Sequence, residues 1–546
     1  MAKLDDELLI SRRALLRRTA VAAGGLVGAR LMAGPGKVLA STLPPVPGAN
    51  ETVSSLLPSG EECRQRVQRM VDFGPRLTGS PAHNRYIAWL EAQFTKYGCT
   101  MLPRDNYPVG YWHLKGTTPC SLKIMSGATP QTITITSYYP RSGRTGANGV
   151  TGPLVYLGAG PAPSLESSNP LTAPEAAELY ERNLSSWLTA AIAGAGSSLR
   201  GSIAMIDLPL PLPLSVAAFL PLMTYYYPPE DLALAGTESY KRLWIAGGAG
   251  LEQLKEAGAV GVVFGFDASP QAMDGQYLPF SGSGPELPAV NVDRETAIRI
   301  RTLAAEKPTA TLTLHAVSER VTTPSIVAVL PGDGSTDEVI VVNTHTDGQN
   351  FVEENGGVAQ TLLARYFHRL PRAERLKRTL VFSAVTGHMA PGLPQTQGFI
   401  DAHPDIIEKT VAAITIEHFG TDEWLDPPSG YYDASRYEPA GCWSSTTEMV
   451  VPLIATIGEH EADKTAVLRG PVALGIGGPF FTKGIPAIGY LTGPNYLVQI
   501  TANGGMDKLN ADFYARQVAW FADLLTRYDK MSAEELRKGD AELYGA

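Results

Sequence analysis

The chain has 546 residues, of which 44% are hydrophobic and 18% charged, and its net charge is -9. This composition is typical of a globular protein with a large core and excludes an extended disordered chain, which needs less apolar content. The acidic balance argues against broad nucleic-acid binding, because clustered lysine and arginine are needed to replace phosphate counterions. The length leaves room for about two to four domains.

The first forty residues are typical of a targeting segment. Residues 11–16 read SRRALL and resemble a twin-arginine export motif, and a weakly apolar, glycine-rich stretch follows. We therefore predict a signal peptide over residues 1–40, export by the twin-arginine route, and a periplasmic or extracellular mature chain without an integral membrane span. An N-terminal membrane anchor is the alternative, although Arg30 interrupts the apolar run.

The four cysteines indicate neither a zinc ribbon nor a disulfide framework. They leave room for one disulfide in an oxidising compartment, and the sequence does not choose the pair. These residues are Cys63, Cys99, Cys120 and Cys442.

Two helices are predicted near the start of the mature chain. Apolar spacing predicts the first over Glu61–Val71, and a loop with glycine and proline follows it. Ser80 can cap the second helix, which we expect from Pro81 to about Tyr97, because proline at the first helical position loses no hydrogen bond. Gly98 ends that helix.

The stretch 145–318 differs in character from its surroundings. Short apolar runs bounded by glycine predict strands, for example at 153–156, 202–206 and 287–292. The sequence here contains no cluster of side chains suited to acid–base chemistry. We therefore predict a separate β-rich module with structural or substrate-gating duties, inserted between residues 41–144 and 319–546.

Strands and helices alternate from Ser325 onward. This order predicts an α/β domain with a mostly parallel, mixed sheet sandwiched between helices. Ligands of such sheets bind at the carboxyl ends of the strands. The expected strands are 325–330, 338–343, 379–385 and 411–416, and the expected helices are 356–368 and 511–528.

Side chains with metal-binding or acid–base chemistry follow three of these strands. His345 and Asp347 come first, two residues apart, so that they point the same way in an extended chain. Glu353 and Glu354 then open the next helix, where a carboxylate is electrostatically favoured.

The next two strand ends carry His388 and the pair Glu417-His418. Three of the nine histidines in the chain thus fall at successive strand ends, whereas a single histidine at such a place is usually only hydrogen-bonded. The sequence therefore predicts that these side chains converge on one cation site.

A family resemblance becomes visible at this point. The chain resembles the zinc exopeptidases that include bacterial leucyl aminopeptidases and plasma glutamate carboxypeptidases. Residues 73–80 look like the family's entry loop, 345–347 like its first metal motif, and 484–487 like the loop after its last metal histidine. The strand that begins at Arg378 looks like the one leading to the catalytic glutamate pair.

Residues 145–318 resemble the protease-associated domain that is often inserted in this family. The residues that carry this resemblance are Ala257-Gly258-Ala259 and 287–290, LPAV. The resemblance thus implies a peptidase-like domain made of residues 41–144 and 319–546.

The resemblance also implies ligands and shows departures from the family pattern. His345 matches the first-site histidine, Glu353 falls at the bridging aspartate, and Glu417 falls at the first-site aspartate. Asp347, Glu354 and His418 are supporting residues or alternative ligands. One histidine and two carboxylates form a three-ligand set with an open position, as catalytic zinc requires.

The second zinc site departs from the pattern altogether. Met389 falls at its glutamate and Gly477 at its histidine, and a thioether and a glycine cannot hold zinc there. His388 falls at the general-base glutamate, and an imidazole can take a proton from water. We therefore predict either one zinc ion or none, with His388 as the catalytic base.

Three functions remain open from the sequence. The first is a secreted metallohydrolase that cleaves peptide or amide bonds of small substrates, in the manner of aminopeptidases or carboxypeptidases. The second is a catalytically inactive, peptidase-like binding protein. The third is a metal-independent hydrolase that uses His388 polarised by Glu417. The oligomeric state is not indicated by the sequence.

Overall fold

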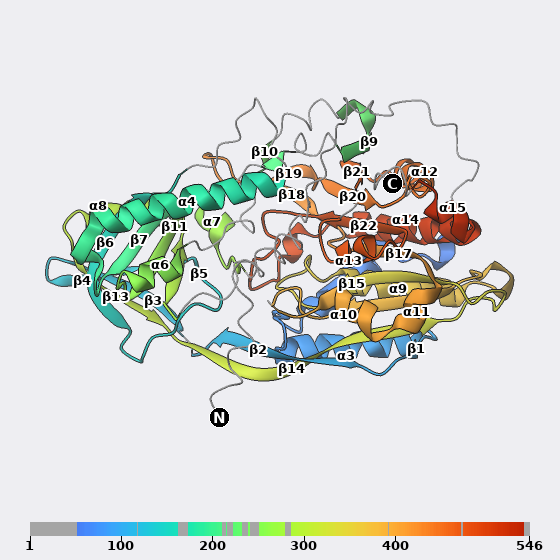
Figure 1. Cartoon of the computed structure of the whole chain (residues 1–546), viewed down its shortest axis with the longest axis horizontal. Helices are drawn as coiled ribbons and strands as arrows, with labels where there is room; N and C mark the ends of the chain where they lie inside the picture. Colours follow the sequence, from blue (N-terminus) through green and yellow to red (C-terminus); the bar gives the residue numbers. More distant parts are fainter. Residues whose placement is uncertain are drawn as a thin grey trace.

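The computed structural model places the peptidase-like part and a second sheet side by side (Figure 1). The predicted signal peptide, residues 1–40, lies outside the described residues. These are 52–116, 118–161, 173–209, 214–215, 222–231, 239–240, 250–278, 286–390, 392–470 and 473–539.

The larger sheet has ten strands and is mixed, as the sequence predicts. Its central strands β16, β15, β17 and β22 are parallel neighbours, whereas β14 and β20 join antiparallel to them. In spatial order the strands are β1 (Thr100–Met101), β14 (Ala316–Leu330), β16 (Thr379–Val385), β15 (Val339–His345), β17 (Thr410–Ile416), β22 (Ala487–Thr492), β20 (Ala440–Ser444), β21 (Thr465–Arg469) and β9 (Met223–Tyr227), and β2 (Asp105–Leu114) pairs with β14.

Helices cover both faces of this sheet, because its central strands are apolar on both sides. In β15, Ile340 and Val342 belong to the core cluster of one face, while Val341 packs with Phe399 and Phe480 on the other. One layer holds α2 (Gly60–Val71), α3 (Pro81–Lys96), α9 (Gly356–Arg369) and α14 (Ala511–Lys530), and the other holds α10 (Gln395–Ala402) and α13 (Gly478–Thr482).

The two predicted N-terminal helices are confirmed, with bounds that differ by one residue. The Ser80 hydroxyl accepts a hydrogen bond from the His83 amide at 3.0 Å and so caps α3, with proline at its first position. The predicted helices at 356–368 and 511–528 correspond to α9 and α14.

The second sheet has eight strands and, with its helices, forms what we call the second unit, residues 115–315 without β9, which belongs to the larger sheet. Its strands in spatial order are β4 (Thr129–Ile133), β3 (Cys120–Ser126), β13 (Thr309–Leu314), β6 (Val150–Ala159), β7 (Ile203–Leu208), β11 (Gly261–Phe266), β12 (Ala289–Val292) and β5 (Ser137–Tyr138). Strands β3, β4 and β5 precede residue 145. The sheet therefore begins earlier than the module predicted at 145–318, whose assignment as a protease-associated domain stays a prediction.

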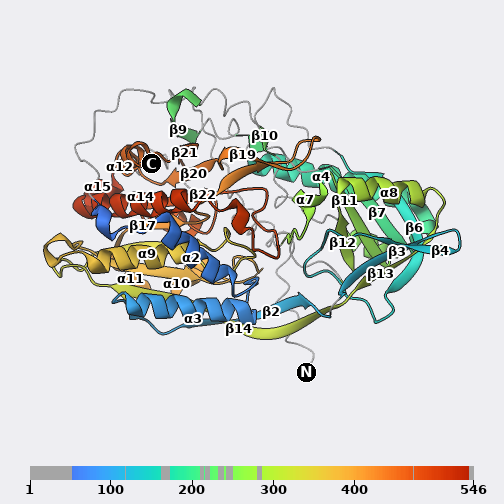
Figure 2. The ribbon, with the colours of Figure 1, turned by 180° about the vertical axis from the view of Figure 1, so that it is seen from behind.

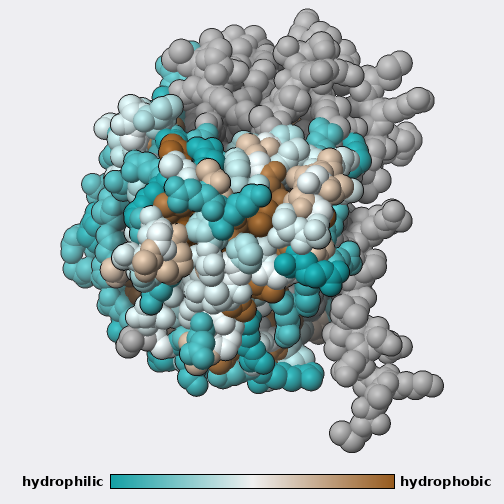
Figure 3. All heavy atoms as spheres, turned by 90° about the vertical axis from the view of Figure 1, so that its left-hand side faces the viewer, coloured by the Kyte–Doolittle hydropathy of each residue, from teal (hydrophilic) through white to brown (hydrophobic). Residues whose placement is uncertain are grey.

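Helices α4 (Ala173–Ala195) and α8 (Arg294–Ala304) lie along the second unit (Figure 1). Its outer end displays hydrophilic residues with scattered hydrophobic ones between them (Figure 3). Among the described residues of this unit, the exposed large hydrophobic side chains are Tyr156 and Ile298.

Several connections hold the second unit to the larger domain, and two of them are made by the backbone. The first is the antiparallel ribbon of β2 and β14, which runs along the lower edge from one unit to the other (Figure 2). The second is a set of backbone contacts, including those from the Tyr277 amide to the Val498 carbonyl and from the Ile500 amide to the Gly275 carbonyl. The second unit therefore touches the segment that follows β22.

None of the four cysteines forms a disulfide, so the pairing that the sequence left open does not occur. In the described part of the chain, no helix combines the length and the apolar character that crossing a membrane requires.

Asn350 holds the loop that leads from β15 to α9. Its Nδ2 donates to the carbonyls of Tyr496 at 2.7 Å and Leu497 at 3.0 Å, and its Oδ1 accepts from the Val352 amide. Because Asn350 is 1% exposed, Asn350→Ala leaves buried groups without partners. We expect a loss of about 2–3 kcal/mol in the free energy of unfolding, measured by urea denaturation.

The control is Asn106→Ala, because Asn106 makes one exposed side-chain hydrogen bond of 3.3 Å. We expect the control to stay within about 0.5 kcal/mol of the natural protein. Equal stability of the two variants would contradict the role given to Asn350.

Candidate metal centre

Five side chains meet at the carboxyl ends of neighbouring parallel strands. His345 is the last residue of β15, His388 follows β16, and Glu417 and His418 directly follow β17. Glu353 lies in the loop before α9. Parallel strands bring their carboxyl ends to one edge of a sheet, so residues distant in sequence become neighbours.

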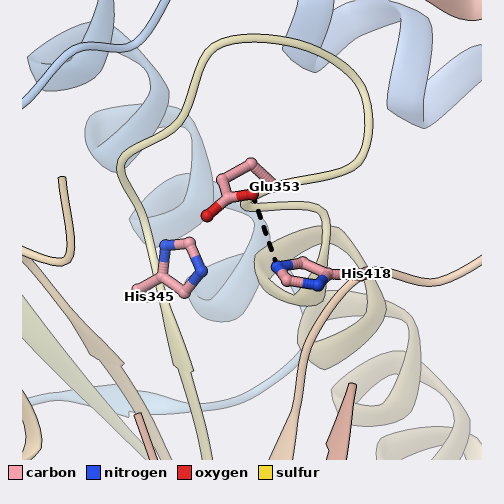
Figure 4. A group of neighbouring side chains, drawn as sticks. All are labelled: His345, Glu353 and His418. Carbon is pink, nitrogen blue, oxygen red and sulfur yellow. Dashed lines mark ion pairs between the residues drawn. The ribbon is translucent and has the colours of Figure 1, made fainter. Parts of the chain in front are cut away.

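The first group within this cluster consists of His345, Glu353 and His418. Their ligand atoms all lie within 4.8 Å of one another. Nε2 of His418 is 3.6 Å from Oε2 of Glu353. Figure 4 shows the three side chains pointing toward one another around a common space.

The second group shares His345 and adds His388 and Glu417. Nε2 of His345 is 3.5 Å from Oε2 of Glu417. The two groups are connected by a further contact of 3.6 Å, between Nε2 of His388 and Oε1 of Glu353.

Backbone carbonyls orient two of the imidazoles. Nδ1 of His345 donates to the Asp347 carbonyl at 2.9 Å, and Nδ1 of His418 donates to the Thr492 carbonyl at 2.5 Å. Each ring therefore carries its proton on Nδ1 and presents the Nε2 lone pair to the cluster, as a metal ligand does. Nothing in the sequence had indicated Thr492, because its part depends on the pairing of β22 with β17.

The donor set fits a divalent cation. Nε2 of His345 and His418, both oxygens of Glu353 and Oε2 of Glu417 have no hydrogen-bond partner among the described residues. The four side chains are between 0% and 4% exposed, and burying such polar groups without partners is costly. Ligands about 2.0–2.2 Å from one zinc ion stand about 3.0–3.6 Å apart, which agrees with the contacts above.

The electrostatics of the metal-free cluster lead to the same conclusion. Burial raises the pKa of Glu353 well above its ordinary value, and the nearby Glu417 and Asp347 raise it further. Burial lowers the pKa of both His388 and His418 to about 4, so that the rings are neutral near pH ~7. Neutral imidazole is the form that binds metal.

The predicted ligand set of His345, Glu353 and Glu417 does not form one group, because the two glutamates fall into different groups. Oε1 of Glu417 accepts from the Ile476 amide at 3.1 Å, which fixes its carboxylate on one side of His345. His418, predicted as an alternative ligand, lies beside Glu353 instead.

His418 reaches that place through an unusual backbone conformation. Its φ is 62°, in the left-handed region that costs a non-glycine residue about 1–3 kcal/mol. Thr492 holds the residue on both sides, since its hydroxyl also donates to the His418 carbonyl at 3.1 Å. Such strain is typical of functional sites.

Asp347 supports the cluster without joining it. Its carboxylate accepts hydrogen bonds from the amides of Gly387, His388 and Met389, at 3.2, 3.2 and 2.9 Å. Thr78 donates a fourth, at 2.5 Å. The carboxylate therefore holds the turn that carries His388.

Glu354, predicted as an alternative ligand, points elsewhere. It forms a buried ion pair with Arg76, whose side chain is 1% exposed. This pair removes Glu354 from both ligand groups.

The two residues that the resemblance places at a second zinc site, Met389 and Gly477, have closely packed surroundings. Met389 is 2% exposed. A side chain at Gly477 would meet Thr415, because a Cβ there would stand 2.8 Å from the Thr415 hydroxyl. A histidine at residue 477 would therefore require the Thr415 side chain to move, and the limit of one ion stays a prediction.

The chain has the fold of the zinc aminopeptidases. It is similar to an aminopeptidase from Aneurinibacillus sp. strain AM-1, with 17% identity, a TM-score of 0.52 and coverage of 87% of this chain and 95% of that one. It is also similar to a Peptidase M28 precursor from Shewanella amazonensis, with 17% identity, a TM-score of 0.55 and coverage of 87% of this chain and 96% of that one. A zinc aminopeptidase from Bacillus subtilis has 12% identity to this chain and a TM-score of 0.53, with coverage of 88% of this chain and 98% of that one.

No protein-family model and no curated protein matches the sequence. At this level of identity the likeness shows the fold, and the predicted resemblance is confirmed to that extent. The chemistry of this chain has to be inferred from its own cluster.

The raised pKa of Glu353 predicts that removing its charge stabilises the metal-free protein. In the metal-free protein, the pKa of Glu353 is higher in the folded state than in the unfolded state. The contribution of Glu353 to the free energy of unfolding therefore falls as pH rises above about 4.5. Glu353→Gln mimics the protonated form, so we expect a higher melting temperature than in the metal-free natural protein. The difference should grow between pH ~5 and pH ~8 in thermal unfolding with a chelator.

The matched control is Glu354→Gln, which leaves the buried Arg76 without its carboxylate and should lower the melting temperature. A melting temperature for Glu353→Gln that is unchanged or lower at pH ~8 would contradict the electrostatic conflict inferred here.

Proposed function

We propose that the protein is a metal-dependent hydrolase that cleaves peptide or amide bonds with one divalent ion, most simply zinc. The carrying observation is that five buried side chains form two groups sharing His345, with Nε2 of His345, Nε2 of His418 and both oxygens of Glu353 unpartnered and turned toward one another. We propose these three as ligands, which leaves an open position for substrate or water. The zinc aminopeptidase fold of the similar structures supports the proposal.

His388 would act as the proton carrier of the reaction. Its side chain is 8% exposed, more than the other four, so it lies where the cluster is closest to solvent. As a neutral ring, it can accept a proton from the attacking water. The protonated ring can then donate that proton to the leaving amine.

Glu417 and Asp347 would assist from either side of His345. Glu417 contacts the ring at 3.5 Å and offers negative charge to the imidazolium that forms at His388. Asp347 fixes the backbone of the His388 turn and, through its carbonyl, the tautomer of His345. When bound, the metal supplies Lewis acidity that polarises the scissile carbonyl and makes water a better nucleophile near pH ~7.

A second candidate is a peptidase-like protein that binds a metal or a ligand without turnover. The burial of the cluster favours this second candidate. A cavity of about 600 Å³ lies elsewhere in the molecule and is lined by other residues, among them Asp422, Asp433 and Asp463. The metal-independent hydrolase suggested by the sequence would use His388 and Glu417 and keep its turnover in a chelator.

We also propose export by the twin-arginine route, on the SRRALL sequence of residues 11–16 alone. Replacing Arg12 and Arg13 by lysine should abolish delivery of the folded protein across the membrane in a cell fractionation experiment. Unchanged export of the double variant would contradict this route.

The proposed ligands and the proposed base can be separated by experiment. His345→Ala and His418→Ala should lose bound metal, whereas His388→Ala should keep about one equivalent and lose about 10²–10⁴-fold in kcat. Metal is measured by elemental mass spectrometry of purified protein, and turnover with an amide substrate library. His403→Ala is the matched control, because His403 pairs with Asp105 outside the cluster.

Three outcomes would reject the proposal or parts of it. Natural protein that binds no metal and hydrolyses no amide rejects the hydrolase altogether. Full turnover after chelation and dialysis selects the metal-independent reaction. Loss of metal in His388→Ala makes His388 a ligand instead of the base.

A further inference from the structure

The second unit sends one cationic side chain to the turn that carries His388. Nη1 of Arg141 donates a hydrogen bond of 3.0 Å to the carbonyl oxygen of Met389, a residue 248 positions away in the sequence. Arg141 lies between β5 and β6 of the second unit, whereas Met389 directly follows His388 in the larger domain. The sequence alone gave no indication of this contact.

Met389 is thereby held on both of its peptide groups. Its amide donates to the Asp347 carboxylate at 2.9 Å, and its carbonyl accepts from the Arg141 guanidinium. Both bonds are charge-assisted and therefore stronger than bonds between neutral groups. The amides of Gly387 and His388 also donate to Asp347, so an anion from one unit and a cation from the other hold the turn between them.

The position of Arg141 is itself fixed by its neighbours. Its φ is 58°, a left-handed conformation that a non-glycine residue adopts only when its surroundings impose it. The Gly143 amide donates to the Leu287 carbonyl, and the Ser142 hydroxyl accepts from the Ala289 amide, which binds this loop to β12 and the segment before it. The guanidinium is thus presented by a rigid part of the second unit.

We propose that Arg141 is a positioning residue for His388, so that the second unit takes part in the reaction by fixing the turn on which the proton carrier lies. This inference rests on the proposed function for its catalytic consequence. The structural link itself, from Arg141 to residues 387–389, can be tested without any turnover.

The main test is hydrogen exchange measured by mass spectrometry on the full chain. Arg141→Met keeps the length of the side chain but removes the donor, and Arg141→Lys keeps a cationic donor. We expect the amides of residues 385–390 to exchange about tenfold faster in Arg141→Met, and Arg141→Lys to restore most of the protection. The control is Arg301→Met, because Arg301 pairs with Asp207 in the same unit, far from this turn in the sequence.

The kinetic test separates positioning from substrate binding. Because a small misplacement of a catalytic group can lower its rate contribution strongly, we expect kcat to fall about tenfold or more in Arg141→Met. KM should change by less than about twofold and the metal content should stay the same, since no proposed ligand is altered. A rise in KM at constant kcat would overturn the positioning role and make Arg141 a substrate contact.

The two proposals fail in different ways. If exchange rises only within 137–143 and 286–292 and stays unchanged at 385–390, Arg141 serves its own unit and the inference is overturned. If exchange rises at 385–390 but neither the natural protein nor any variant turns over an amide, the positioning of the turn holds and the proposed hydrolase fails. Loss of protection in Arg301→Met equal to that in Arg141→Met would also overturn the inference.

Discussion

Two carboxylates buried against three imidazoles form the constraint on which the rest of this structure depends. Of the four oxygens of Glu353 and Glu417, only one accepts a hydrogen bond from the described residues. Burying ionised carboxylates in this way is strongly unfavourable unless a cation neutralises them. Neutral histidines beside them cannot do so, because the burial that brings them together also lowers their own pKa.

The scaffold around the cluster keeps this arrangement in place. The parallel strands β15, β16 and β17 carry the three histidines at or just after their carboxyl ends. The polar residues next to these histidines form hydrogen bonds that fix the backbone, and they are not proposed as metal ligands. Asp347 holds the His388 turn, Thr492 holds His418 in its left-handed conformation, and Asn350 holds the loop before Glu353. Backbone strain and uncompensated buried charge at one place, held by hydrogen bonds from the surrounding residues, are typical of a functional site.

Much of the fold follows from local sequence signals. The buried runs of β15, β16 and β17, the serine cap of α3 and the helical period of α14 are all visible in the sequence, because each depends on near neighbours. The likeness to zinc aminopeptidases at 12–17% identity agrees with that pattern. His345, His388 and Glu417 at successive strand ends, with Glu353 just before the next helix, likewise indicated one site.

The role of each residue within the site could not be predicted from the sequence. His418, and not Glu417, lies beside Glu353 because the φ of His418 is 62° and because the Ile476 amide donates a hydrogen bond to Glu417. Neither feature can be predicted from a pattern in the sequence. Glu354, predicted only as a supporting or alternative ligand, pairs with Arg76, a partner 278 residues away in the sequence. Contacts between residues far apart in the chain decided these assignments.

The proposed single ion site uses two imidazoles and one carboxylate, whereas Met389 and Gly477 offer no ligand for a second ion. Crystals of the protein grown with zinc, measured at the zinc absorption edge, test this account most directly. We expect one anomalous peak, within bonding distance of Nε2 of His345, Nε2 of His418 and the Glu353 carboxylate. The absence of a peak among these atoms, or a second peak beside Met389 and Gly477, would contradict it.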